Sequence, residues 1–158
     1  MRIRTNISDY GLSLAEAKNY CRIEVSDDDA LVSSLITASY EQVCAECNRD
    51  FTPASYSISF FSSSGDLFIT SQDAYNISTG SVKYLDGSWY SYFQDTYTGT
   101  LTYEVASGSV VPNNVKVAQL LLVSQWYDHR QSNVDKKTGT LDFTVNALLN
   151  PYKITKPQ

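Results

Sequence analysis

The stretch of sequence that decides the fold is PNNVKVAQLLLVSQWYDHR, residues 112–130. Pro112 suits the first turn of a helix, where its missing amide hydrogen costs nothing. The four consecutive apolar residues 120–123 exceed what a helix with one solvated face requires. We therefore predict a core helix over 112–130 that is contacted on several sides and ends in an aromatic and basic tip.

Two segments follow this helix. Residues 131–144 are largely polar and include Gly139, a composition that predicts a loop. Residues 145–153 read VNALLNPYK and predict a short C-terminal helix. Pro151 should end that helix, because proline lacks the amide hydrogen that continues the backbone ladder.

The N-terminal residues 12–50 predict two helices. Ser13 and Glu16 have the spacing of a capping box, in which each side chain accepts a hydrogen bond from the backbone amide of the other residue. Ser26 precedes three aspartates and is expected to cap the second helix, whose start favours negative charge. That helix should end near residues 48–50.

The middle of the chain, residues 54–110, predicts β-structure. Strict alternation places three apolar side chains on the core face of a strand, namely Tyr56, Ile58 and Phe60. A turn is expected at 62–66, after which 67–69 would pair back.

A second turn and strand complete this region. Asp86 and Gly87 stand between strand-like flanks, as in a two-residue hairpin turn, where glycine accepts the positive φ. Residues 101–105 alternate again and predict another strand. The fold class is therefore α+β. A small helical bundle of two N-terminal helices, a long central helix and a short C-terminal helix carries an inserted antiparallel sheet.

Length and composition limit the function. At 158 residues the chain is most simply a single domain. Its formal net charge of −5 argues against a simple nucleic-acid-binding protein, which needs a basic face. Three cysteines do not suit a disulfide framework, so we expect reduced thiols in a cytosol. We recognise neither a secretory signal nor a membrane-spanning stretch.

Metal and redox chemistry have a weak candidate in the pair Cys44 and Cys47. Adding Cys21 and His129 would reach the ligand count of a zinc site. The pair lies within a helical stripe, however, and buried thiols on a helix are the favoured interpretation. We predict no metal and no cofactor.

Catalysis has no convincing candidate either. Residues 27–29 lack the alternating acids and the glycine of a calcium loop, so helix capping is preferred. His129 is the sole histidine, and no nucleophile motif accompanies it. We predict no catalytic residue.

An aromatic cluster surrounds the hairpin: Trp89, Tyr90, Tyr92, Phe93 and Tyr97. Flat rings on a sheet can bind glycans or bases. Core and subunit-interface roles are favoured, because tyrosine is common in both. An aromatic glycan-binding module remains an alternative.

An ordered set of short motifs runs along the chain: SLAEAK at 13–18, CRI at 21–23, the acidic stretch 26–29, AECNRDF at 45–51, and LLLV at 120–123 with Trp126, Tyr127 and Arg130. In this set the chain resembles the head–tail connector (adaptor) proteins of long-tailed phages. The segment VNALLNPY at 145–152 is similar to the closing motif of that family.

The resemblance implies a structural virion protein that sits in the neck and passes through the host cytoplasm during assembly. Such proteins form a ring of about a dozen subunits below the portal protein, through head-to-tail contacts. The ring would extend the DNA channel without sequence-specific binding and would dock a head-completion or tail-terminator protein. Another neck protein, of the head-completion or tail-terminator type, is an alternative. The expected subunit or portal contacts are Trp126, Tyr127, Arg130, Leu148, Leu149, Pro151 and Tyr152.

Overall fold

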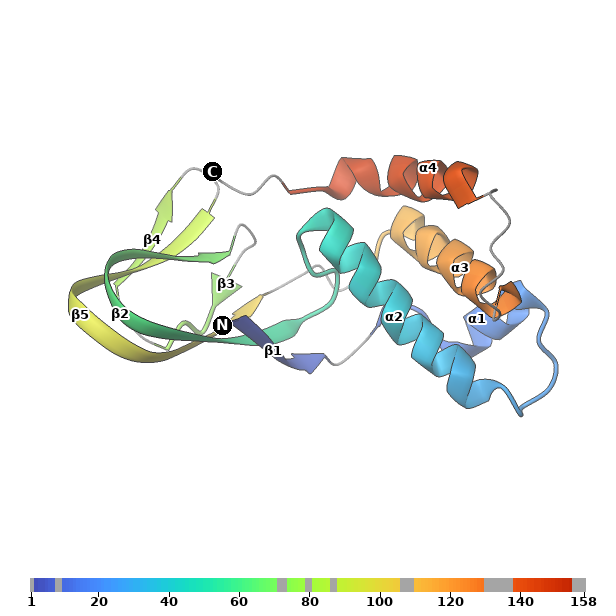
Figure 1. Cartoon of the computed structure of the whole chain (residues 1–158), viewed down its shortest axis with the longest axis horizontal. Helices are drawn as coiled ribbons and strands as arrows, with labels where there is room; N and C mark the ends of the chain where they lie inside the picture. Colours follow the sequence, from blue (N-terminus) through green and yellow to red (C-terminus); the bar gives the residue numbers. More distant parts are fainter. Residues whose placement is uncertain are drawn as a thin grey trace. The chain divides into compact units, whose positions relative to one another are not determined.

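The computed structural model describes residues 2–7, 10–70, 74–78, 81–85, 88–105, 110–129 and 138–154. The chain forms two compact units (Figure 1). The β unit contains Met1–Ser8, Arg49–Ser109 and Ile154–Gln158, and the helical unit contains Asp9–Asn48 and Val110–Lys153. The chain therefore begins in the β unit with β1, enters the helical unit, returns to build the rest of the sheet, and then completes the helical unit.

The helical unit contains α1 (Leu14–Cys21), α2 (Asp29–Cys47), α3 (Asn113–Asp128), α4 (Thr138–Leu149) and a 3₁₀ turn, η1 (Asn150–Tyr152). Helix α3 packs against α1, α2 and α4 (Figure 1). The buried side chains of α3 are Val115, Ala118, Gln119, Leu122 and Val123. The prediction that this helix is contacted on several sides is confirmed, and its neighbours belong to the same chain.

The capping box of α1 is confirmed. The hydroxyl of Ser13 accepts a hydrogen bond from the backbone amide of Glu16 at 3.2 Å, and Glu16 accepts one from the amide of Ser13 at 2.8 Å. The end of α2 also agrees with the sequence, since α2 stops at Cys47 and Asn48 takes the left-handed conformation, with φ of 52°.

The expected cap at Ser26 is wrong. Helix α2 starts at Asp29, and Asp28 occupies the cap position without a side-chain capping bond. Tertiary partners engage both carboxylates instead. Asp28 accepts a hydrogen bond from the hydroxyl of Tyr127 at 2.6 Å, and Asp29 forms an ion pair with Lys18.

The loop predicted at 131–144 is also wrong in its second half. Helix α4 already begins at Thr138, while residues 130–137 lie outside the described part of the chain. Val145 and Leu149 of α4 are buried, and the helix packs against α3 and α2. Packing of this kind stabilises a helix whose first residues have low intrinsic helix propensity.

The β unit is one antiparallel sheet of five strands: β1 (Arg2–Ile7), β2 (Ala54–Thr70), β3 (Ala74–Tyr75), β4 (Ser81–Leu85) and β5 (Ser88–Val105). Their order is β1-β2-β5-β3, and β4 also pairs with β5. The pairing of Leu85 with Ser88 confirms the predicted hairpin, whose turn residues Asp86 and Gly87 lie outside the described part of the chain. An α+β fold is thus confirmed.

Strands β2 and β5 form a long ribbon that bends back on itself. Their register runs from Ala54 opposite Val105 to Thr70 opposite Trp89, with several shifts. At about 3.3 Å per residue, a straight ribbon would hold Ile69 tens of ångströms from Tyr103. Yet the hydroxyl of Tyr103 donates to the carbonyl of Ile69 at 3.4 Å. The register shifts provide the bends, and the curled ribbon is visible in Figure 1.

The bend encloses the core of the β unit. Its buried members are Ala54, Tyr56, Ile58, Ile69, Leu101, Tyr103 and Val105. The inward faces predicted for Tyr56 and Ile58 are confirmed, whereas the side chain of Phe60 lies outside the description. The turn predicted at 62–66 is wrong, because β2 continues without interruption to Thr70. Residues 67–70 pair with β5 and not with the first part of β2.

Strand β1 was not predicted. It pairs with β2, with Arg4 opposite Tyr56. The guanidinium of Arg4 forms an ion pair with the buried carboxylate of Asp50, and its Nε donates a hydrogen bond to the hydroxyl of Tyr56 at 3.0 Å. The hydroxyl of Tyr56 in turn donates to Asp50. A short polar strand of this kind is held by partners distant in sequence, so local patterning does not reveal it.

Gly11 is expected to be sensitive to substitution. Its φ is +73°, and a Cβ at this position would lie 2.8 Å from Cγ2 of Val111. Left-handed backbone alone costs a non-glycine residue roughly 1–2 kcal/mol. We expect Gly11→Ala to lower the free energy of unfolding by at least that amount, measured by urea denaturation.

Val111→Ala provides the matched background for this test. Removing the methyl groups of Val111 relieves the clash but leaves the backbone strain, so Gly11→Ala should cost less in this background than in the wild-type protein. Equal costs in both backgrounds would show that the close approach of Gly11 to Val111 has no energetic effect.

Candidate interaction surface

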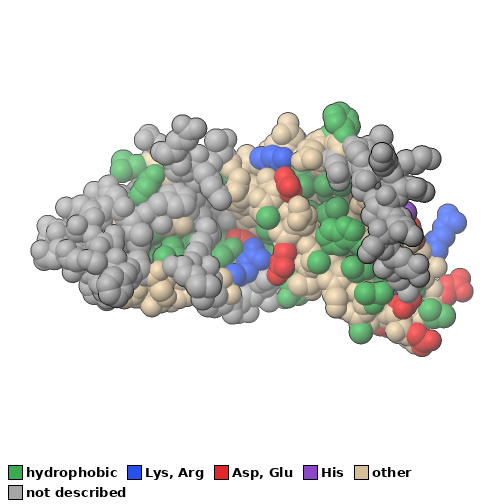
Figure 2. All heavy atoms as spheres, viewed as in Figure 1, with side chains coloured by type: hydrophobic (Ala, Val, Ile, Leu, Met, Phe, Trp, Pro, Cys, Tyr) green, Lys and Arg blue, Asp and Glu red, His purple; other side chains and the backbone are tan. Residues whose placement is uncertain are grey.

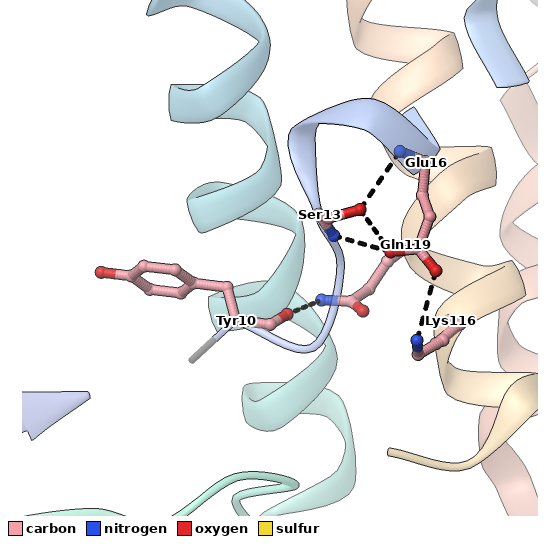
Figure 3. A network of polar contacts seen from close by, with 5 residues as sticks. All are labelled: Tyr10, Ser13, Glu16, Lys116 and Gln119. Carbon is pink, nitrogen blue, oxygen red and sulfur yellow. Dashed lines mark hydrogen bonds and ion pairs between the residues drawn. The ribbon is translucent and has the colours of Figure 1, made fainter. Parts of the chain in front are cut away.

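A polar network joins the start of α1 to α3 in the helical unit (Figure 3). Gln119 is fully buried on α3, and its Nε2 donates to the carbonyl of Tyr10 at 2.9 Å. Lys116, one turn earlier, lies 3.4 Å from Oε1 of Glu16, the acid of the capping box. The N-terminus of α1 is therefore anchored to α3 by groups that sequence reasoning did not single out. The sequence offered one sign of this contact: Gln119 is a polar residue next to the apolar run 120–123, where a buried hydrogen bond could be expected.

The α3 tip, Trp126 and Tyr127, was predicted to be a contact surface. Both side chains are half-buried in the chain itself. Tyr127 packs against the core of the helical unit, and its hydroxyl reaches Asp28 at the start of α2. Arg130 lies outside the described residues. The tip is consequently tied to the connection between α1 and α2.

The predicted C-terminal contact residues are divided by the structure. Leu149 is fully buried and its carbonyl faces Sγ of Cys47 at 3.9 Å, so its side chain belongs to the core and cannot meet another protein. Expecting Leu149 at an interface was wrong, because α4 buries this face against α2 and α3. Leu148 and Tyr152 are half-buried, and Pro151 is exposed.

These two groups of residues do not form one surface. Helices α3 and α4 pack side by side and run in opposite directions (Figure 1). The C-terminal end of α3, with Trp126, therefore lies at the opposite end of this helix pair from the C-terminal end of α4, with Pro151. Any contacts they make are with different surfaces.

A groove of about 290 Å³ opens beside the C-terminal segment. Its lining combines apolar and polar side chains from three helices: Gln42, Glu46, Leu122, Val145, Asn146 and Leu149. Lys153 spans the rim, with Nζ 3.0 Å from Oδ1 of Asn146 and 3.5 Å from Oε2 of Glu46. The groove offers a shallow recess for a neighbouring side chain and no catalytic constellation.

The candidate zinc residues are dispersed. Cys44 and Cys47 are buried in α2, whereas His129 is exposed at the end of α3. Burial raises the pKa of the Cys21 thiol, which opposes the thiolate form that metals and oxidants need. Within the described residues, no three His, Cys, Asp or Glu side chains converge on a common point.

The aromatic cluster is partly accounted for. Trp89 is half-buried and packs against the core of the β unit, and Tyr90 is half-buried. The side chains of Tyr92, Phe93 and Tyr97 lie outside the description.

In the described part of the chain, no helix is both long and apolar enough to cross a membrane.

Exposed apolar side chains lie elsewhere than predicted. Phe143 on α4 is 76% exposed, and Val25 between α1 and α2 is 57% exposed. Sequence patterning missed Phe143, because the residue fell in the segment taken for a loop.

Comparison with known proteins gives one family match and several structural matches. The family model described as phage gp6-like head–tail connector protein matches residues 12–105, more than half of the chain. This span includes α1, α2 and most of the sheet and ends before α3. No curated protein sequence matches the chain.

Solved structures match the entire chain. One is described as the neck of an empty GTA particle with C6 symmetry, with a TM-score of 0.69, 14% identity, and coverage of 100% of this chain and 97% of the other. Another, the virion of a native gene transfer agent (GTA) particle, has a TM-score of 0.69, 12% identity and the same coverage. The neck of a native GTA particle with C12 symmetry has a TM-score of 0.68, 13% identity and again the same coverage. At these identities the likeness establishes the fold.

Glu16 should make stability depend on pH. Hydrogen bonds from the side chain and then the backbone of Ser13 lower the pKa of Glu16 below its ordinary value of 4.5, and Lys116 adds to the effect. Because the folded pKa is the lower one, the unfolded chain binds more protons between the two values, and stability rises with pH there.

We therefore expect Glu16→Gln to be less stable than the wild-type protein above pH 4.5, and the difference to vanish as the pH falls through the folded pKa. Urea denaturation at several pH values measures this. Glu41→Gln, at an exposed position on α2, corrects for the loss of one charge. A difference that grows towards low pH would contradict the assignment.

The Tyr127 hydroxyl should stabilise the fold. Tyr127→Phe removes the donor to Asp28 and should cost on the order of 1 kcal/mol in the free energy of unfolding. Tyr20→Phe is the matched control, because Tyr20 is 45% exposed on α1 and should tolerate the change. Equal losses in the two variants would exclude a specific role for the hydrogen bond.

Proposed function

The chain belongs to the family of phage gp6-like head–tail connector proteins, and from this premise we propose that it is one subunit of a ring in the virion neck. Its role is structural: it connects head and tail. We propose further that the ring lies below the portal protein, extends the DNA channel and docks the next neck or tail protein. No catalytic role and no cofactor are proposed.

The observation that carries this proposal is the match of the whole chain to proteins in symmetric particles. Those structures are necks with C6 and C12 symmetry, and they share this fold from end to end. A ring of about a dozen copies needs one heterologous contact repeated by rotation until it closes. Each subunit must then present two different surfaces, as the opposite ends of the α3–α4 pair do.

The proposed partners follow from this position. The portal protein would lie on one side of the ring and a head-completion or tail-terminator protein on the other. DNA would pass through the channel without sequence-specific binding. The net charge of −5 supports passage without retention, since few cations are present to neutralise phosphates. Assembly would take place in the host cytoplasm.

The predicted contact residues retain a role in this proposal. Trp126, Tyr127 and Arg130 are proposed to meet a neighbouring subunit or the portal, and Leu148, Pro151 and Tyr152 to meet a different surface. A glycan-binding role has less support, because Trp89 packs against the core of the β unit. The family match likewise favours a connector over a head-completion or tail-terminator protein.

Trp126→Ala tests the proposed contact. The half-buried indole should contribute both to the fold and to a neighbouring surface, as aromatic anchors commonly do. We expect fewer rings by electron microscopy, both for the purified protein alone and with portal particles. Trp126→Phe should retain more assembly.

Thermal unfolding of the same variants separates the two roles. A Trp126→Ala protein that assembles completely and only melts at a lower temperature would show that Trp126 serves the core alone. A wild-type protein that forms no ring, alone or on portal particles, would refute the proposed function itself.

A further inference from the structure

Helix α4 has apolar side chains on two opposite faces. Val145 and Leu149 are buried against the rest of the helical unit. Phe143 is 76% exposed, and Ala147, one turn later, is also exposed. Pro151 extends this outer line by another four residues. A helix that is apolar on both sides normally has two partners, and its own chain supplies one of them.

A second exposed apolar patch lies at the α1–α2 corner, residues 20–31. Tyr20, Val25 and Leu31 are 45%, 57% and 38% exposed. Glu24 and Asp27 are exposed among them, and so is Arg22, so the exposed charged side chains of the corner carry one net negative charge (two acids and one base). Figure 2 shows hydrophobic and acidic side chains side by side over this connection. The corner therefore fits an apolar surface that carries no negative charge of its own.

The flank of α4 carries a cation. The ammonium of Lys153 donates to Asn146, the residue that precedes Ala147 on α4. Its carboxylate partner, Glu46, lies 3.5 Å away in an exposed pair, an interaction that contributes little stability and leaves the ammonium available to a second acid. The outer face of α4 and the α1–α2 corner are thus both apolar, and Lys153 places a cation beside the apolar line of α4, at the rim of the groove.

The two surfaces lie on different sides of the helical unit. Helix α3 contacts both α1 and α4 and lies between them (Figure 1). A single copy therefore cannot join its own α4 to its own corner. Two different surfaces that complement each other on separate copies are what a head-to-tail ring requires.

We propose that the outer face of α4 in one copy packs against the α1–α2 corner of the next copy. The occupant of each surface is a second copy of this chain, and the inference rests on the proposed ring. Phe143 is the central anchor, and Lys153 faces Glu24 and Asp27 across the contact. The α3 tip adjoins this corner through the bond between Tyr127 and Asp28.

Site-specific crosslinking tests the arrangement. Phe143→Cys and Val25→Cys are prepared separately in a Cys21→Ala background, since Cys44 and Cys47 are buried. A short bismaleimide is added to each variant and to their mixture, all assembled with portal particles. We expect crosslinked dimers joining position 143 to position 25 in the mixture alone, identified by peptide mass spectrometry.

Other outcomes overturn the proposal. Crosslinking of Phe143→Cys alone would mean that α4 meets α4 of its neighbour. Rings that are seen by electron microscopy without the 143–25 crosslink would reject this contact and leave the proposed function standing. The absence of both rings and crosslinks would refute both.

Charge at position 143 provides an independent test. Phe143→Glu places an acid against the acidic corner and should weaken association about tenfold or more, as loss of a central anchor does. Phe143→Lys should weaken it less, because lysine faces Glu24 and Asp27. Ala45→Glu, at an exposed position on α2, is the control for an added acid. Equal or greater loss with lysine would exclude the corner as the partner.

Discussion

The burial of α3 between α1, α2 and α4 is the constraint on which the helical unit depends. Helices α1 and α2 precede strands β2 to β5 in the chain, and α3 follows these strands. The apolar side chains of α3, with Val115, Ala118 and Val123 fully buried, join these distant segments. The bundle is therefore complete only after the chain has returned from the β unit. The tight approach of Val111 to Gly11 lies where the returning chain meets the start of the bundle.

Each of the two units buries a polar side chain that forms hydrogen bonds with residues distant in sequence. In the helical unit, Gln119 donates to the carbonyl of Tyr10. In the β unit, Asp50 is 2% exposed. Its carboxylate forms an ion pair with Arg4 and accepts a hydrogen bond from the hydroxyl of Tyr56. A buried polar group without a partner is costly, so each of these contacts also selects one arrangement of the chain. These polar contacts determine how the segments are placed, whereas burial of the apolar side chains supplies most of the free energy of folding.

The distribution of apolar surface changes how the connector role is understood. The apolar run of α3, residues 120–123, packs within the same chain: Leu122 and Val123 are buried, and Leu120 and Leu121 are half-buried. Exposed apolar side chains are found on α4, with Phe143, and at the α1–α2 corner, and also at Val110 before α3 and Val117 on α3. A protein whose function is to bind copies of itself and other virion proteins is expected to carry its function on such surfaces and not in a pocket.

The sequence by itself determined the helices, the capping box at Ser13, the end of α2, the hairpin at 84–89 and the α+β class, because these follow from spacing and from local turn chemistry. It also carried the family resemblance. Only the tertiary structure decided that β1 exists, that β2 runs unbroken into a bent ribbon with β5, that α4 begins at Thr138, and that Leu149 faces inward while Phe143 faces outward. Those features depend on partners far away in the chain, and a local pattern contains no information about which face a distant partner will cover.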